Sequence, residues 1–312
     1  MDNVLKNRVS YSQYKLWKKC PLAYKFKYVD KIADDKKNIH LAFGTSMHDT
    51  IQSFLYVEYN KRKLPKDAEV NGIPVRDYLI KEGNKTVGFD YKRLLKERMY
   101  SEVKNIPMEQ RDNSINLDTM NEFYYDGLHI MDYLIKKRSE WFSVKGYELV
   151  DIEFELEEDI KNNLVFTGFI DILLKSKTGS YIIIDLKTST SGWKDYHKKD
   201  KSLTNQNLLY KHYLSKKLDI PYDKIMVEYI VLKRKVPDDP EFPALAKRIQ
   251  RFIPTDGKVS MNKAVYDFND FVESVFDENG ERVSDGYNPT PSKSNCRFCE
   301  FRERKLCKFA VN

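Results

Sequence analysis

The sequence predicts an α/β fold in which helices flank a central mixed β-sheet. Residues 164–175 and 181–189 are apolar and rich in β-branched side chains, which is typical of buried strands. Residues 225–233 form a third segment of this kind. Before it, residues 204–217 have the pattern of a helix that begins after a polar loop. Together these segments indicate an α/β protein.

Length and composition fit a soluble globular protein. The 312 residues are 41% hydrophobic and 32% charged. No apolar run approaches the roughly 20 residues of a membrane-spanning helix, and the N-terminus lacks an apolar signal-peptide core, so we expect a cytoplasmic protein with no membrane partner. The net charge of +7 fits a polyanionic partner, but it also fits many ordinary proteins.

We divide the chain into four segments. Residues 1–55 contain N-terminal helices with Cys20, and residues 56–150 are expected to form a mostly helical insertion, with helices near 91–98 and 120–141. Residues 151–235 contain the predicted strands, and residues 236–312 begin with a Pro- and Asp-rich loop and carry the other cysteines.

The two strands at 164–175 and 181–189 are predicted to form a hairpin that carries paired acids. A turn centred on Thr178 places Asp171 opposite Asp185, with Cβ atoms about 5 Å apart. Lys187 lies on the same face as Asp185, because strand side chains alternate. Opposed carboxylates repel, so a hard divalent cation is expected between them. The alternative is a solvated sheet edge with scattered charges, but three isoleucines directly precede Asp185.

The four cysteines have an unusual distribution. Three lie within twelve residues near the C-terminus and the fourth precedes a proline near the other end: Cys296, Cys299, Cys307 and Cys20. Disulfides are disfavoured in a cytosolic chain, so the alternatives are structural zinc, an iron–sulphur cluster, or four unrelated thiols that are buried or merely tolerated. The remote fourth cysteine favours the cluster without excluding zinc, and either would join the two ends of the chain.

Other polar residues fall at helical positions. Thr45 or Ser46 is predicted to cap a helix that has His48 in its first turn, where the helix dipole favours the neutral, metal-binding ring. Gln206 and Tyr210 are four residues apart and share a helix face, which is also typical of an ordinary solvated surface.

A capping-box pattern at residues 10–13 predicts the start of an N-terminal helix. This helix interleaves aromatic and basic residues, among them Tyr14, Trp17 and Lys18. Such a pattern suits single-stranded nucleic acid, and a half-buried amphipathic helix explains it nearly as well.

Six stretches, taken in order, resemble a known nuclease family. They are SYSQYKLWKKCPLAYKFKYVDKI, FGTSMHDTIQ, GFIDILL, IIIDLKTST, QNLLY and CRFCEFRERKLC, which span residues 10–307. The chain resembles the PD-(D/E)xK superfamily, specifically the RecB-like nucleases with a four-cysteine cluster. That group includes the AddB nuclease domain, the CRISPR adaptation nucleases and related viral exonucleases.

The resemblance implies a restriction-endonuclease-like sheet and roles for individual residues. His48, Asp171, Asp185 and the Leu186 carbonyl would bind Mg²⁺ or Mn²⁺, and Lys187 would orient or activate the attacking water. Gln206 and Tyr210 match a motif linked to substrate positioning. Cys20, Cys296, Cys299 and Cys307 match the ligands of a [4Fe-4S] cluster. The family often has proline before the first acid, whereas this chain has Ile170.

The expected activity is metal-dependent hydrolysis of phosphodiester bonds by a DNA exonuclease. It would act on single strands or DNA ends in recombination, repair or replication, with recombination or replication proteins as partners. The alternatives are an endonuclease, a CRISPR-adaptation-type trimming nuclease, and a DNA-binding scaffold subunit of a recombination complex. The insertion at 56–150 would form either one wall of a DNA channel or a stabilising subdomain.

Overall fold

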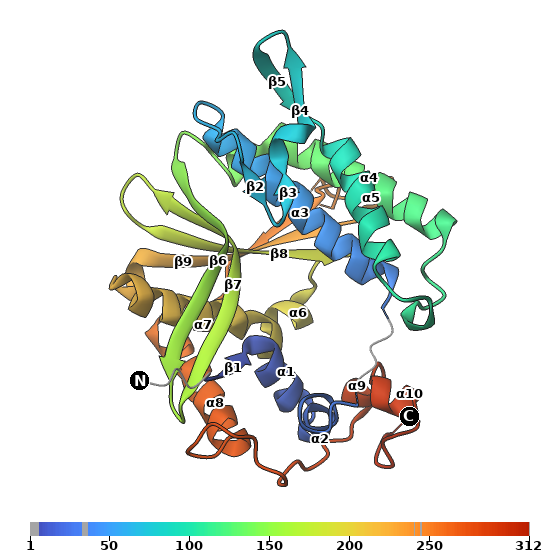
Figure 1. The fold of residues 1–312 in the computed structure, drawn as a ribbon, viewed down its shortest axis with the longest axis vertical. Helices are drawn as coiled ribbons and strands as arrows, with labels where there is room; N and C mark the ends of the chain where they lie inside the picture. Colours follow the sequence, from blue (N-terminus) through green and yellow to red (C-terminus); the bar gives the residue numbers. More distant parts are fainter. Residues whose placement is uncertain (1–5, 33–36, 240, 244, 312) are drawn as a thin grey trace.

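A six-stranded mixed sheet forms the centre of the protein. The computed structural model describes residues 6–32, 37–239, 241–243 and 245–311. The strand order is β1-β7-β8-β9-β10, and β6 also pairs with β7 (Figure 1). The strands are β1 (Asn7–Ser10), β6 (Tyr147–Ile160), β7 (Leu164–Ser176), β8 (Tyr181–Ser189), β9 (Ile225–Lys233) and β10 (Ile249–Phe252). The predicted α/β fold with a mixed central sheet is confirmed.

The hairpin of β7 and β8 has the predicted register. Ile172 pairs with Ile184 and Lys175 with Tyr181, which centres the turn on Thr178. β9 runs parallel to β8 on its other side, so β8 is an interior strand. This explains why its isoleucines are buried and why its sequence is apolar rather than alternating.

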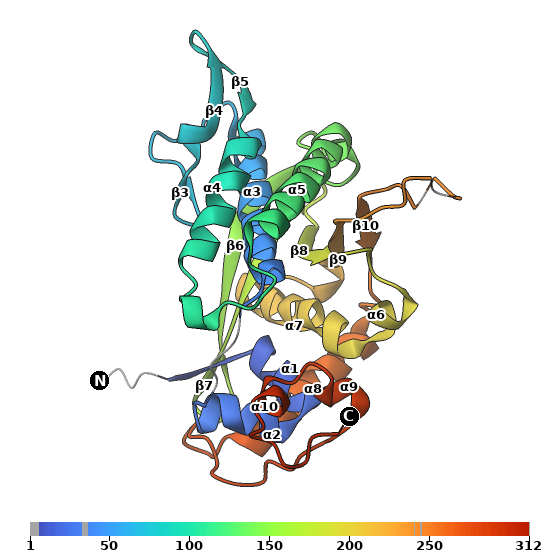
Figure 2. The same ribbon diagram turned by 90° about the vertical axis from the view of Figure 1, so that its right-hand side faces the viewer.

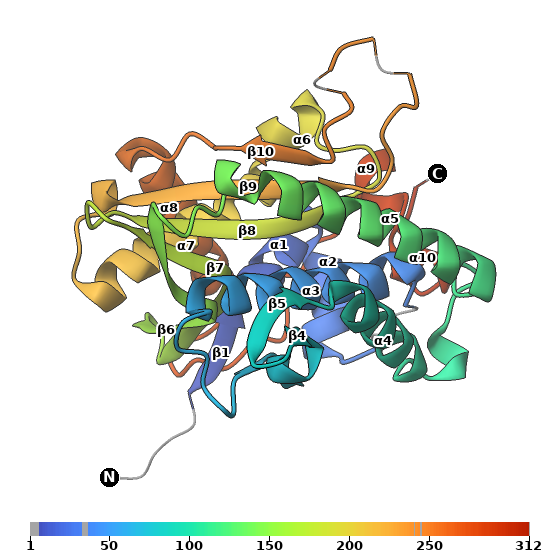
Figure 3. The same ribbon diagram turned by 90° about the horizontal axis from the view of Figure 1, so that it is seen from above.

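Helices cover both faces of the sheet. α3 (Ile39–Asn60), α4 (Tyr91–Lys104) and α5 (Leu117–Lys137) pack on the face to which Ile184 and Leu186 of β8 point. α1 (Tyr11–Lys19), α7 (Lys201–Leu218) and α8 (Lys258–Val275) pack on the other face, where Ile183 points. Figure 1 shows β8 and β9 between these two helical layers, and the view from above looks onto the layer that contains α4 and α5 (Figure 3). Each face therefore has its own hydrophobic core.

The longest strand, β6, was not anticipated from the sequence. It pairs with β7 along almost its whole length, and the register shifts between Leu149 and Asp151. Its acidic side chains alternate with apolar ones, and it has a partner strand on only one side. An edge strand with one solvated face does not have the continuous apolar run that marks β8.

The segment 56–150 contains both helices and strands. α4 and α5 confirm the helices expected near 91–98 and 120–141, but two hairpins precede them. These are β2 (Glu69–Val70) with β3 (Ile73–Pro74), and β4 (Leu79–Glu82) with β5 (Lys85–Phe89), which projects from the body of the molecule (Figure 1). The first hairpin turns at Asn71-Gly72, where both residues have positive φ, as Asn-Gly turns require.

The N-terminal helices and the C-terminal tail form one lobe. Here α1, α2 (Pro21–Tyr24) and the π-helix at Lys25–Val29 lie beside α9 (Lys293–Cys296) and α10 (Glu300–Glu303) (Figure 2). The side chains of Thr290 and Asn295 both donate hydrogen bonds of 2.8 Å to the carbonyl of Lys19. The two ends of the chain are thus held together.

Residue Ser10 is the N-cap of α1 as predicted, but its side chain makes no capping hydrogen bond. Gln13 donates instead to the carbonyl of Arg8. The remaining helices are α6 (Asp195–Lys199) and α7, which begins three residues before the predicted start at 204. None of the described helices combines the length and apolar character needed to cross a membrane.

Candidate active site

The candidate site lies where β7 and β8 separate. Their ladder ends at Ile172 and Ile184, and Asp171 and Asp185 follow on the two strands. The backbone N–H of Leu186 donates a hydrogen bond of 2.7 Å to Oδ2 of Asp171. A side chain thus takes the place of the next backbone hydrogen bond, and the strands open around the two acids.

Asp185 is the most buried acid of the site. Only 4% of its side chain is exposed, and Nζ of Lys187 lies 2.6 Å from its Oδ2. This oxygen nevertheless makes no hydrogen bond of normal geometry with any residue that the structure describes. An ionised oxygen in this position retains the capacity to bind a cation.

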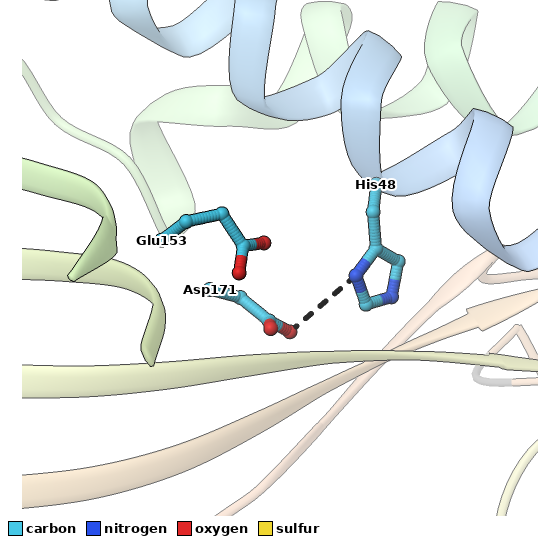
Figure 4. A group of neighbouring side chains, drawn as sticks. All are labelled: His48, Glu153 and Asp171. Carbon is cyan, nitrogen blue, oxygen red and sulfur yellow. Dashed lines mark ion pairs between the residues drawn. The ribbon is translucent and has the colours of Figure 1, made fainter. Parts of the chain in front are cut away.

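His48 reaches the site from α3. Its Nδ1 lies 3.6 Å from Oδ2 of Asp171 (Figure 4). The predicted cap at Thr45 or Ser46 is wrong, because α3 begins at Ile39 with Asn38 as its N-cap. His48 therefore lies in the third turn, beyond the reach of the helix dipole. Burial, and then the charge of Lys187, lower its pKa instead, so the neutral ring is still favoured.

Glu153 is a residue of the site that the sequence analysis missed. Ligand atoms of His48, Glu153 and Asp171 all lie within 4.8 Å of one another, and Figure 4 shows the three side chains converging from α3, β6 and β7. The backbone of Glu153 is left-handed, with φ of 51°. Its neighbours Ile152 and Phe154 pair with β7. No sequence pattern distinguishes this glutamate from the other acidic residues of β6.

Burial and mutual repulsion raise the pKa values of the acids. Burial raises the pKa of Asp171, and burial together with the charge of Asp171 raises the pKa of Asp185 to about 6. Burial, and then Asp171, also raise the pKa of Glu153. For Lys187, burial alone would lower the pKa, but the charges of Asp185 and Asp171 outweigh it and raise the pKa. The site thus concentrates negative charge that a cation would stabilise.

The helix α7 brings Gln206 and Tyr210 to the site. Nε2 of Gln206 donates a hydrogen bond of 3.1 Å to the hydroxyl of Tyr210. A Cβ added at Gly168 of β7 would lie 2.6 Å from Cε1 of Tyr210. The glycine therefore leaves the space that the tyrosine ring occupies, which explains a glycine three residues before Asp171.

The aromatic side chains of α1, which were predicted to contact nucleic acid, pack into the core instead. Tyr14 is only 3% exposed and packs on Phe268 and Phe271, so it has no free face for a base. Trp17 packs on Phe271 as well, whereas Lys18 is exposed.

A neighbouring lysine, Lys15, was missed. The residue as a whole is exposed, but burial of its amine and then the charge of Lys187 lower its pKa. Tyr11, one helical turn earlier, donates to the carbonyl of Ser202 at the start of α7. Lys15 therefore lies close enough to Lys187 and Asp185 for their charges to interact, while Trp17 packs on Phe271 of α8.

The four cysteines line one pocket in the terminal lobe. Cys20 comes from the loop between α1 and α2, while Cys296, Cys299 and Cys307 come from the C-terminal tail, and none forms a disulfide. Among the described residues, no three of their sulphur atoms lie within 4.8 Å of one another. Four thiolates on one zinc ion, each about 2.3 Å from it, would stand about 3.8 Å apart. The pocket does not have the spacing of a closed site for a single ion.

A second, larger pocket opens beside the acids. It has a volume of about 330 Å³, and His48, Glu153 and Thr188 are among the residues that line it. Gly44 of α3 lies close to Thr188, because a Cβ added at this glycine would stand 3.4 Å from the threonine hydroxyl oxygen. The site is therefore open to solvent on the side of α3.

The comparisons with known proteins agree with this geometry. A family model described as the PD-(D/E)XK nuclease superfamily matches residues 8–307. The chain belongs to this superfamily. The matched residues include Asp171, Asp185 and Lys187, the three residues that the sequence analysis expected at the acidic and basic positions of the family motif.

The match to solved structures is weaker. A structure titled "Crystal structure of SSO0001" is 15% identical, covers 71% of this chain and 82% of the other, and has a TM-score of 0.31. None of the curated proteins matches the chain.

Proposed function

We propose that the protein is a Mg²⁺- or Mn²⁺-dependent deoxyribonuclease that hydrolyses phosphodiester bonds at single strands or DNA ends. The observation that carries this proposal is the group of His48, Glu153 and Asp171, whose ligand atoms lie within 4.8 Å of one another, together with the buried pair of Asp185 and Lys187. A divalent cation held by these residues would offset the repulsion between Asp185 and Asp171.

The donor set fits a hard divalent cation. His48, Glu153 and Asp171 supply one imidazole and two carboxylates whose ligand atoms lie within 4.8 Å of one another, and Asp185, which is outside that group, interacts electrostatically with Asp171 and His48. The Leu186 carbonyl is the remaining candidate ligand. Oxygen-rich sites of this composition suit Mg²⁺ and Mn²⁺ better than softer metals. When bound, the cation polarises the scissile phosphate and lowers the pKa of water.

The residues around the acids then act on the substrate. Lys187 holds a protonated amine 2.6 Å from Asp185, where it orients the attacking water and offsets phosphate charge. The Tyr210 hydroxyl, oriented by Gln206, is placed to hydrogen-bond the phosphate backbone. Lys15 adds a further cation from α1. These three elements would hold one phosphate between β8, α7 and α1.

A basic groove supports a polynucleotide substrate. It has a volume of about 700 Å³ and lies at the end of β8, with Ser191 among its lining residues. Ser191 is four residues from Lys187, or about 13 Å along an extended chain. The groove is lined by five basic residues and one acidic residue: Lys194, Lys233, Lys235, Lys247, Arg251 and Glu140. Lys235 is paired with Glu122 and Asp126, and Arg251 with Glu228, so the exposed Lys194 and Lys247 are the residues best able to contact a phosphate backbone.

We assign the four cysteines to a [4Fe-4S] cluster. They share one pocket, and among the described residues no three of their sulphurs are as close together as the ligands of a single ion would be. In a cubane cluster each thiolate binds a different iron, so wider spacing is expected. Its role would be structural, because the lobe joins α1 to the C-terminal tail.

The test is digestion of 5′- and 3′-labelled single- and double-stranded DNA with and without Mn²⁺. We expect metal-dependent loss of label from ends, no cleavage by Asp185→Ala, and retained DNA binding by that variant. Cleavage by Asp185→Ala at the wild-type rate would remove Asp185 from the mechanism.

Circular DNA separates the remaining alternatives. An exonuclease leaves a covalently closed circle intact, whereas an endonuclease cuts it. A scaffold subunit would bind DNA without cleaving either substrate. The two buried aspartates beside Lys187 favour catalysis, since a scaffold gains nothing from their repulsion.

A further inference from the structure

We propose that Asn71, in the turn of the β2–β3 hairpin, is a positioning residue that holds the metal site through Gln52 and Glu153. The inference rests on the proposed metal site and assigns the hairpin a role in it. Asn71 lies in the segment 56–150, in which the sequence analysis identified no site residue.

A chain of hydrogen bonds connects the hairpin with the site. Nε2 of Gln52 donates to Oε1 of Glu153 at 2.6 Å and to the backbone carbonyl of Asp171 at 3.0 Å. Nδ2 of Asn71 donates to Oε1 of Gln52 at 2.8 Å. One buried amide thus contacts two residues of the candidate metal site, and Asn71 contacts that amide.

The orientation of the Gln52 amide depends on Asn71. Gln52 is fully buried, so each of its polar atoms needs a partner. Its two N–H groups serve Glu153 and Asp171, which offer only acceptors, and its oxygen meets the Asn71 donor. If the amide turned over, its oxygen would face two acceptors and its nitrogen would face a donor. The Asn71 donor therefore fixes the orientation that Glu153 requires.

The orientation of the Asn71 side chain is fixed in turn by Asp49. Its second N–H donates to Oδ1 of Asp49 at 2.8 Å, and Nε of Arg98 on α4 donates to Oδ2 of Asp49 at 2.7 Å. An aspartate accepts only, so Nδ2 of Asn71 must face it. Asp49 lies next to His48 on α3, and Arg98 belongs to the segment 56–150.

Glu153 needs such support for two physical reasons. Its left-handed backbone costs free energy, and unusual conformations of this kind persist only where neighbours fix them. Its carboxylate also lies next to that of Asp171, so repulsion would drive it away from the site before a cation binds. The Gln52 N–H holds it in place.

The experiment compares Mn²⁺ binding by wild type and Asn71→Gly, measured by electron paramagnetic resonance without DNA. Glycine keeps the left-handed turn and removes only the side chain. Loss of an outer partner of a metal ligand weakens metal binding about tenfold or more. We expect an increase in the Mn²⁺ dissociation constant of about tenfold for Asn71→Gly.

The matched control is Asn163→Gly. Asn163 also has a left-handed backbone, in the turn between β6 and β7, and its φ is 53°. We expect wild-type Mn²⁺ affinity for this variant. Wild-type affinity in Asn71→Gly as well would overturn the inference.

A double variant separates positioning from a general loss of structure. In a Glu153→Gln background, Asn71→Gly should cause little further loss of Mn²⁺ affinity, because the residue through which it acts has already changed. A further loss as large as in the wild-type background would show that Asn71 acts through the fold, and the inference would be wrong.

The outcome is independent of the proposed nuclease activity. If wild type binds Mn²⁺ but cleaves no DNA, the proposed function fails and the Asn71 comparison can still be made. If wild type cleaves DNA and Asn71→Gly binds Mn²⁺ normally, only the positioning role fails.

Discussion

The backbone N–H of Leu186 donates a hydrogen bond to Oδ2 of Asp171 across the point where β7 and β8 separate. A strand residue presents its N–H and its carbonyl to the same neighbouring strand. The Leu186 carbonyl therefore points to the same side as the Asp171 carboxylate. This relationship is the geometric support for including that carbonyl in the proposed ligand set.

Glu153→Gln is expected to lower Mn²⁺ affinity and the rate of DNA cleavage by about 10- to 100-fold. The change keeps the hydrogen-bonding shape but removes the negative charge beside Asp171. Isothermal titration calorimetry measures the affinity, and end-labelled DNA measures the rate. Glu155→Gln, an exposed position on the same strand, is the control. Equal affinities for both variants would exclude Glu153 from the metal site.

Gly168→Ala should lower the free energy of unfolding by about 1–3 kcal/mol, because the added methyl group overlaps the Tyr210 ring. We also expect slower cleavage, since displacing the ring breaks its hydrogen bond with Gln206. Urea denaturation and the cleavage assay test the two effects.

The control for this substitution is Gly146→Ala, where the nearest atom lies 3.7 Å from the added methyl group. A change of similar size in both variants would argue against a specific contact with Tyr210.

Mn²⁺ affinity should rise with pH up to about 6 and then level off. Burial raises the pKa of Asp185 to about 6, so protons compete with the cation below that value. The sign for stability is the reverse. Between about pH 4, near the ordinary pKa of an aspartate, and about pH 6, Asp185 keeps its proton in the folded protein but loses it in the unfolded chain. The contribution of Asp185 to the stability of the metal-free protein therefore falls as the pH rises through this range.

Titrations of Mn²⁺ at pH 5, 6, 7 and 8 test this dependence. Asp185→Asn should bind more weakly at every pH and lose the rise attributed to Asp185. An affinity for wild type that falls with increasing pH would contradict the assignment.

Cys299→Ala is expected to remove the brown colour of the purified protein and its iron. One ligand of the proposed cluster is lost, while the catalytic residues are unchanged. Visible absorption and elemental analysis measure the effect, with Lys293→Ala in the same lobe as control. A colourless wild-type protein containing zinc would replace the iron assignment with zinc.

Lys247→Ala should weaken binding of single-stranded DNA similarly for all sequences. The slope of the logarithm of the affinity against the logarithm of the salt concentration should become smaller by about one. Lys247 is exposed in the basic groove, so its loss removes one phosphate contact. Fluorescence anisotropy at several salt concentrations tests this. Lys177→Ala, at the β7–β8 turn, should leave both quantities unchanged.

The sequence by itself determined the interior of the sheet and the paired acids. β8 lies between two strands, so its apolar run is continuous, and the short turn at Thr178 fixed the register that brings Asp171 and Asp185 together. These are local patterns, because the residues concerned lie within one hairpin. The order of the cysteines along the chain likewise indicated that the two ends meet.

Only the tertiary structure decided the rest of the site. Glu153 belongs to an edge strand whose acids look alike in sequence, and its position depends on pairing with β7 and on contacts from α3. Tyr14 lies in the core because α8 packs on that face of α1, which no pattern within α1 specifies. Asn71 reaches the site through a hairpin that folds back on α3. Contacts between segments far apart in the chain produce no local sequence pattern. Those contacts determine which of several similar side chains reach the site.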